Sequence, residues 1–185
     1  NDTVQLPFAN ASYKIKDLAK ISVYGYWLAD DDNPLTNPDG STKLDTKSAQ
    51  TYGFTVAGSP KITKSVKLHY RGEYSYQTDY KNKNNTFKLH RYNLMLGATA
   101  FNITAKAAIE ELGSNGTSSF QTPLGTNHKF QGWADMFLAT PKDGIRDVNA
   151  SLSTKLLGTK LAFVYHNFKS AVGSTDYGNE YDFVI

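Results

Sequence analysis

The stretch 65–77 alternates apolar and polar residues more regularly than any other part of the chain. Its even positions from 66 to 76 hold Val, Leu, Tyr, Gly, Tyr and Tyr, whereas its odd positions from 67 to 77 hold Lys, His, Arg, Glu, Ser and Gln. A period of two held for this long predicts a β-strand with one apolar and one polar face. Whatever fold the chain adopts must therefore provide two different environments on the two sides of this strand.

The same periodicity recurs along the chain and predicts nine strands, at residues 4–14, 19–29, 50–58, 65–77, 87–100, 103–112, 148–156, 160–168 and from 180 onward. Short connections follow the first, third, fifth and seventh strands, and long connections follow the others. Strands of about 9 to 11 residues joined by alternating short turns and long loops are typical of outer-membrane barrels. We therefore predict an all-β fold, an antiparallel up-and-down transmembrane β-barrel, with residues 1–185 as a single barrel segment. Because bacterial single-chain barrels have even strand counts, we expect the segment to be part of a larger barrel.

Composition excludes several classes of protein. The chain has no cysteine, which rules out a disulfide scaffold and a thiol nucleophile, and its net charge of +3 is too small to indicate a nucleic-acid partner. No apolar run approaches the roughly 20 residues of a membrane helix. The four histidines lack the spacing of metal ligands, and no catalytic triad, phosphate-binding or dinucleotide motif is present. We therefore expect no enzymatic activity, no cofactor and no metal site.

Aromatic side chains cluster near the ends of the predicted strands. If the apolar faces meet lipid, these side chains would form girdles at the two membrane interfaces, although aromatic residues are also common in strands generally. The residues concerned are Tyr13, Trp27, Tyr52, Tyr74, Tyr76, Phe87, Phe101 and Tyr181.

The polar faces supply candidate lumenal residues. They are Lys67, His69, Arg71, Arg91, Lys106, Lys155 and His166. A lumen lined by cations would attract anionic solutes, including uronates. Four acidic residues, Glu73, Glu110, Glu180 and Asp182, would share that lumen. The alternative is that acids and bases form a ladder of neutralising cross-strand pairs that only supports the wall.

The long connection from Gly113 to Asp147 is exceptional in length, and loops of this kind are usually functional. We expect part of it to fold inward and narrow a pore, with one or two helical turns over 131–138. The alternative is an extracellular loop packed on its own aromatic residues. The candidate constriction residues are His128, Lys129, Trp133, Asp135 and Arg146.

The long loop also resembles a known family. Residues 120–126, 128–135 and 137–138 are similar to the signature loop of alginate-export-type outer-membrane porins, and 144–147 and 176–182 continue the similarity. The resemblance is strongest from Tyr92 onward. It implies a barrel in the outer membrane of a Gram-negative bacterium, with a basic conduit for solute. Its partners would be membrane lipid and a small-molecule or oligosaccharide solute, and both a homo-oligomer and a larger outer-membrane complex remain compatible with it.

Pattern and resemblance together favour a passive channel for small hydrophilic solutes, which could include anionic, uronate-like ones. The main alternative is a structural or interaction barrel in the outer membrane that binds a partner through its extracellular loops. A soluble β-sandwich that binds carbohydrate through Trp133 and the tyrosines is a more distant alternative.

Overall fold

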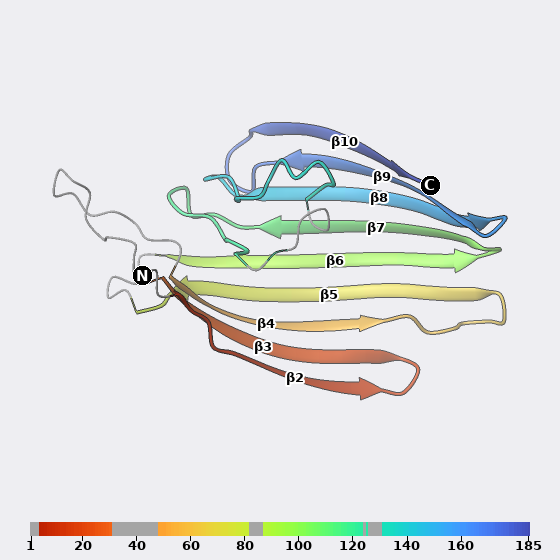
Figure 1. The fold of residues 1–185 in the computed structure, drawn as a ribbon, viewed down its shortest axis with the longest axis horizontal. Helices are drawn as coiled ribbons and strands as arrows, with labels where there is room; N and C mark the ends of the chain where they lie inside the picture. Colours follow the sequence, from red (N-terminus) through yellow and green to blue (C-terminus); the bar gives the residue numbers. More distant parts are fainter. Residues whose placement is uncertain (1–3, 31–47, 82–86, 124, 126–130) are drawn as a thin grey trace.

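The computed structural model describes residues 4–30, 48–81, 87–123, 125 and 131–185 (Figure 1). Within these residues, all regular secondary structure consists of β-strands. The strands are β1 (Val4–Gln5), β2 (Phe8–Ile15), β3 (Ala19–Asp30), β4 (Ala49–Gly58), β5 (Val66–Asp79), β6 (Lys88–Ala100), β7 (Ile103–Leu112), β8 (Ile145–Leu156), β9 (Thr159–Lys169) and β10 (Asp176–Val184). The described part of the chain contains no helix of the length and apolarity needed to cross a membrane.

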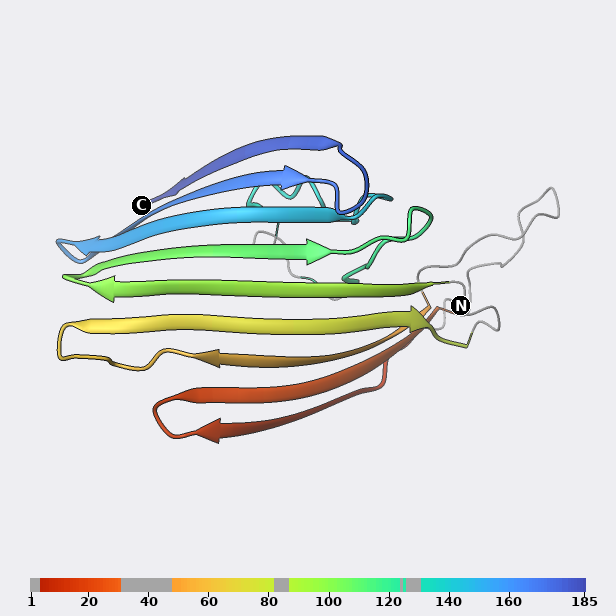
Figure 2. The same ribbon diagram turned by 180° about the vertical axis from the view of Figure 1, so that it is seen from behind.

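The strands form one antiparallel up-and-down sheet in which each strand from β3 to β10 pairs with its neighbour in sequence. Figures 1 and 2 show the short connections β2–β3, β4–β5, β6–β7 and β8–β9 at one end of the sheet, here named the turn end. The opposite end, here named the loop end, carries the connections β3–β4, β5–β6, β7–β8 and β9–β10, of which the first three are longer than any connection at the turn end. Among the described residues β2 pairs only with β3 and β10 pairs only with β9, so the sheet is not closed.

β1 and β2 are two parts of one strand position. Both pair with β3 in a single continuous register, Val4 opposite Asp30 and Phe8 opposite Tyr26. Pro7 lies between them and has no N–H to donate to a ladder, although its carbonyl accepts a 3.0 Å bond from the Trp27 N–H. The ten strands therefore fill nine positions in the sheet, which confirms the predicted nine-strand meander.

Two strands start earlier than their periodicity predicts. β8 begins at Ile145 and β10 begins at Asp176, so the long loop runs over 113–144. The helical turns expected over 131–138 are absent, because this segment consists of bends and turns in which Gln131 and Asp135 have φ of 51° and 55°. That part of the prediction is wrong, since a left-handed residue interrupts a right-handed helix.

The register assigns every strand residue to one of two faces, because directly opposite residues in an antiparallel pair lie on the same side of the sheet. One face, here named the apolar face, exposes large hydrophobic side chains on strands from β3 to β10. They include Val23, Phe54, Leu94, Leu96, Val148, Leu152, Phe163 and Phe183, each more than two-fifths exposed. The other, here named the polar face, holds most of the charged strand residues.

The main hydrophobic cluster lies on the polar face at the loop end. It comprises Ala49, Phe87, Leu89, Leu112, Phe120, Ile145 and Phe168, and Phe137 and Tyr177 pack against it. Phe120 and Phe137 come from the long loop, so the loop and the sheet enclose the cluster between them. Phe87 is only 2% exposed there, and its predicted place in an interfacial girdle is wrong.

Other predicted girdle residues do lie on the apolar face near the loop end. The indole of Trp27 meets Tyr52 edge-on at 5.7 Å, and its Nε1–H donates to the Tyr52 hydroxyl at 2.9 Å. Tyr74 and Tyr76 both contact the ring of His90. These rings form a row across β3 to β6, each pairing a polar tip with an apolar body.

Candidate lumenal site

The structure places all seven predicted lumenal residues on the polar face. Lys67 lies opposite Thr99, which lies opposite Thr104, and that residue lies opposite Ser153. His69, Arg71, Arg91, Lys106, Lys155 and His166 fall on the same side by the same register. The strand alternation predicted this grouping correctly, but the surroundings of the seven residues differ sharply.

Arg91 is held in a buried ion-pair cluster. Its guanidinium donates from Nη1 to Glu73 at 2.6 Å and from Nε to Glu110 at 2.8 Å, and it is only 7% exposed. Arg71 binds the second oxygen of Glu73. Arg91 reaches diagonally, since Ser75 and Leu112 are its direct partners in the ladder. Around Arg91 the structure therefore shows the alternative considered above, in which acids and bases form neutralising cross-strand pairs. Arg91 is not a free cation on the polar face.

A tyrosine extends this cluster across a neighbouring strand. The Tyr24 hydroxyl donates to Glu73 Oε1 at 2.8 Å and lies 2.7 Å from Ser75 Oγ. To reach β5 the ring passes over β4 at Gly53, where a Cβ atom would meet the Tyr24 ring at 2.9 Å or closer. A glycine at this position therefore makes the contact between β3 and β5 possible.

The predicted lysines have a different environment, near the turn end. Within the described part of the chain, Lys67, Lys106 and Lys155 form no ion pair. Lys106 lies over Gly97, where a Cβ would meet its Cγ at 2.6 Å. The charge of the polar face is therefore compensated near the loop end and uncompensated near the turn end.

The two histidines predicted to be lumenal are both hydrogen-bonded. His166 donates from Nδ1 to Asp147 at 2.9 Å and has Asp182 3.7 Å from Nε2, and His69 lies 2.7 Å from the Thr99 hydroxyl. Among the described residues no group of three or more His, Asp or Glu side chains is arranged to hold a metal ion.

The long loop lies against the polar face, as Figures 1 and 2 show from opposite sides. The Gln77 side chain donates to the Gln121 carbonyl at 2.9 Å and accepts from the Gln121 N–H at 2.9 Å. Gln131 donates to Glu110 at 2.7 Å, so the loop joins the Arg91 cluster.

Further along, the loop is attached to the last strand. Glu180 of β10 accepts from the N–H groups of Trp133 at 2.5 Å and of Ala134 at 2.9 Å. Gly132 has a φ of +88° and leaves room for the Glu180 carboxylate, which a Cβ there would meet at 2.7 Å or closer. Phe137 then packs on Phe168 with ring centroids 4.9 Å apart. These contacts hold the described part of the loop against the sheet.

A small pocket of about 170 Å³ remains between the loop and the wall. It is lined by Tyr26, Arg71, Glu73, Arg91, Glu110, Thr122, Gly125 and Gln131. Its lining combines acidic and basic members of the ion-pair cluster on the sheet with polar groups of the loop. It can therefore hydrogen-bond a hydrophilic solute both from the sheet and from the loop.

Only part of the predicted constriction set belongs to this arrangement. Trp133 is held through its backbone, and Asp135 follows it in the same segment. Arg146 does not belong, because it lies on the apolar face and donates to Glu111 at 2.6 Å. It was assigned to the loop because β8 was expected to start three residues later. His128 and Lys129 lie outside the described residues.

Sequence reasoning did not single out the glutamines that hold the loop. Gln77 falls on the polar side of the 65–77 alternation, so its face was evident, but nothing in the sequence pairs it with Gln121. Comparison of the chain with family models, with curated proteins and with solved structures gives no match.

Proposed function

We propose that this chain forms the wall of an outer-membrane β-barrel porin that passes small hydrophilic, anionic solutes passively. One observation carries the proposal: the exposed large hydrophobic side chains lie on one face of the sheet, whereas a buried network of charged groups lies on the other. A protein in water favours the reverse, with its apolar face covered. Lipid around the apolar face and water inside the barrel accommodate both faces.

The position of the long loop favours a conducting channel rather than a barrel without a pore. In porins, loops that fold into the barrel narrow the lumen and set its selectivity. Here the described part of the loop contacts polar-face residues of the sheet, through Gln77, Glu110, Glu180 and Phe168. We infer that it forms a fixed constriction, with the pocket beside Arg71 as the narrow point. The similarity to alginate-export-type porins agrees with this proposal.

The uncompensated lysines favour anions as the solute. In a water-filled lumen enclosed by a low-dielectric wall, fixed charges act over longer distances than at a free surface. Arg71 and Arg91 contribute less than their number suggests, because Glu73 and Glu110 offset them. Selectivity would then depend mainly on Lys67 and Lys106.

Planar-bilayer recording of the purified protein tests the proposal. We expect ohmic conductance with a reversal potential that indicates anion preference in a salt gradient, and a shift toward cations in a Lys67→Gln, Lys106→Gln double variant. A Lys142→Gln, Lys169→Gln double variant removes the same charge from the loop end and serves as the control. A correctly folded protein that does not conduct would instead favour the interaction barrel that binds a partner through its loops, and a protein soluble without detergent would contradict both.

A further inference from the structure

Lysines at the turn end are arranged in directly opposed pairs. The pairs are Lys14 opposite Lys20, Lys61 opposite Lys67, and Lys155 opposite Lys160. Directly opposite side chains in an antiparallel ladder have Cβ atoms about 5 Å apart, and like charges at such positions destabilise the pairing. An unliganded sheet gains nothing from three such pairs at one end.

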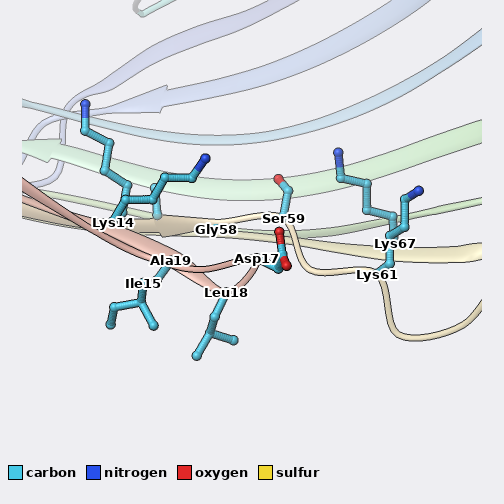
Figure 3. A pocket seen from close by; sticks show the side chains of 11 residues that line it. Lys14, Ile15, Asp17, Leu18, Ala19, Gly58, Ser59, Lys61 and Lys67 are labelled. Carbon is cyan, nitrogen blue, oxygen red and sulfur yellow. The ribbon is translucent and has the colours of Figure 1, made fainter.

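Two of the pairs line one pocket. It has a volume of about 610 Å³ and is formed by the β2–β3 turn and the start of the β4–β5 connection. Figure 3 shows Lys14, Lys61 and Lys67 extending from the same side of the sheet, whereas Ile15 and Leu18 point to the other side. Lys20 completes the basic set, and Asp17 is the one carboxylate among the described residues of the lining.

Within the part of the chain that the structure describes, the lysines of this pocket lack the ion-pair partners that the charged groups of the Arg91 cluster have. Each charge around Arg91 has a partner within the protein, and the four lysines here have no ion pair with any described residue. An ammonium group is best satisfied by a charged oxygen, which gives hydrogen bonds about twice as strong as those between neutral groups. Four ammonium groups around one opening require several such oxygens on one molecule.

We propose that this pocket is a binding site for a multivalent oxyanion, a molecule that carries several phosphate or carboxylate groups along a short chain. Its volume lies within the range of roughly 300 to 1,000 Å³ typical of small-molecule sites. The oxyanion offsets the repulsion within the Lys14–Lys20 and Lys61–Lys67 pairs. The proposal goes beyond conduction, because the site binds its ligand whether or not the barrel forms an open pore.

Isothermal titration calorimetry of the full chain in a neutral detergent tests the site. One arm uses tripolyphosphate and a second uses trigalacturonate, with acetate at equal ionic strength as the monovalent reference. We expect saturable binding of at least one of the two multivalent anions, no saturable binding of acetate, and weaker affinity at higher salt. The arm with the tighter binding identifies phosphate or carboxylate as the preferred group. Absence of saturable binding in both arms would overturn the proposal.

A pair of double variants separates a site from diffuse attraction. Lys14→Gln with Lys20→Gln removes one opposed pair from the pocket, whereas Lys155→Gln with Lys160→Gln removes an opposed pair on the same face and at the same end but outside it. We expect the first to weaken binding roughly tenfold or more and the second less than about threefold. Equal losses would show that the anion follows overall charge, and the pocket would have no special role.

Thermal unfolding provides a second measurement that does not depend on calorimetry. Without anion, the Lys14, Lys20 double variant should unfold at the same or a higher Tm than the native chain, because a repulsive pair is gone. With tripolyphosphate or trigalacturonate in excess, the native chain should gain more Tm through ligand binding than the variant does. A variant that gains as much Tm as the native chain would contradict the site.

Discussion

Gln77 of β5 and Gln121 of the long loop are joined by two reciprocal hydrogen bonds of 2.9 Å each. The side-chain amide of Gln77 presents a donor and an acceptor to the backbone of Gln121, much as a neighbouring strand would. Gln77 is 1% exposed, and its Nε2 also donates to Thr51. One buried side chain of the sheet therefore hydrogen-bonds both backbone polar groups of a loop residue.

Replacing Gln77 with leucine keeps the side-chain volume and removes both bonds. We expect the unfolding free energy to fall by about 1 to 3 kcal/mol, because two hydrogen bonds of about 0.5 to 1.5 kcal/mol each are lost at a part-buried site. Hydrogen exchange followed by mass spectrometry should show faster exchange across 119–123. Gln50→Leu is the control, since Gln50 is partly exposed on the other face. Unchanged exchange in Gln77→Leu would mean that the loop is held by its other attachments alone.

Arg91→Met should be among the most damaging single substitutions. It leaves Glu73 and Glu110 buried without their shared cation, and removing one partner of a buried ion pair typically costs about 3 to 5 kcal/mol. Arg71→Met is the matched control, because the Arg71 side chain is 40% exposed and Glu73 keeps its ion pair with Arg91 in that variant, so we expect a loss of about 1 kcal/mol. Chemical denaturation in detergent micelles measures both variants. Similar losses for the two arginines would disprove the different roles assigned to them.

Gly53→Ala should disconnect Tyr24 from Glu73. The added methyl group would occupy the space of the Tyr24 ring, and overpacking of this kind costs about 1 to 3 kcal/mol. At Gly72, in the next strand, a Cβ would meet only Leu94 at 3.7 Å, so Gly72→Ala should stay within about 0.5 kcal/mol of the native chain. Denaturation midpoints compare the two. A tolerated Gly53→Ala would show that the ring can move aside without loss.

Lysine scanning across β6 tests which side of the sheet meets lipid. Leu96 lies on the apolar face and is 66% exposed, and its neighbour Met95 lies on the polar face. For a strand in a bilayer, Leu96→Lys should cost about 2 to 4 kcal/mol if the residue lies near the midplane, whereas Met95→Lys should cost much less. Unfolding from lipid vesicles measures both. If Leu96→Lys proves harmless and Met95→Lys damaging, the assignment of the faces in the proposed barrel is wrong.

The strands were predictable because each obeys a local rule. Period two in 65–77 and its neighbours follows from the pleat, and short connections place consecutive strands side by side. Face assignments followed directly, which is why Lys67, Arg91 and Lys106 could be grouped before any register was known. The first residues of β8 and β10 were less predictable. Polar residues such as Arg146 and Asp176 continue the hydrogen-bonded ladder there, but they do not continue the alternation of apolar and polar residues.

The loop and its contacts depend on register, which periodicity does not encode. Arg91 meets Glu110 because β6 and β7 pair with Asn93 opposite Glu110, and a shift of two residues would preserve the pattern and break the cluster. Inward and outward positions of the loop were equally compatible with its aromatic residues. In the structure Phe120 belongs to the hydrophobic cluster on the polar face and Phe137 packs against it, and the cluster includes residues such as Phe87 and Phe168 that lie far from the loop in sequence.

The bond between Glu180 and the backbone of Trp133 also constrains the order of assembly. The chain emerges during synthesis with 131–134 well before β10, so the loop segment is made before the carboxylate that holds it exists. Phe168 likewise follows the loop. Both β9 and β10 must therefore be in place before this part of the loop can take its final position. In a membrane, such a barrel would pass through an intermediate whose wall is formed while its lumen is still wide.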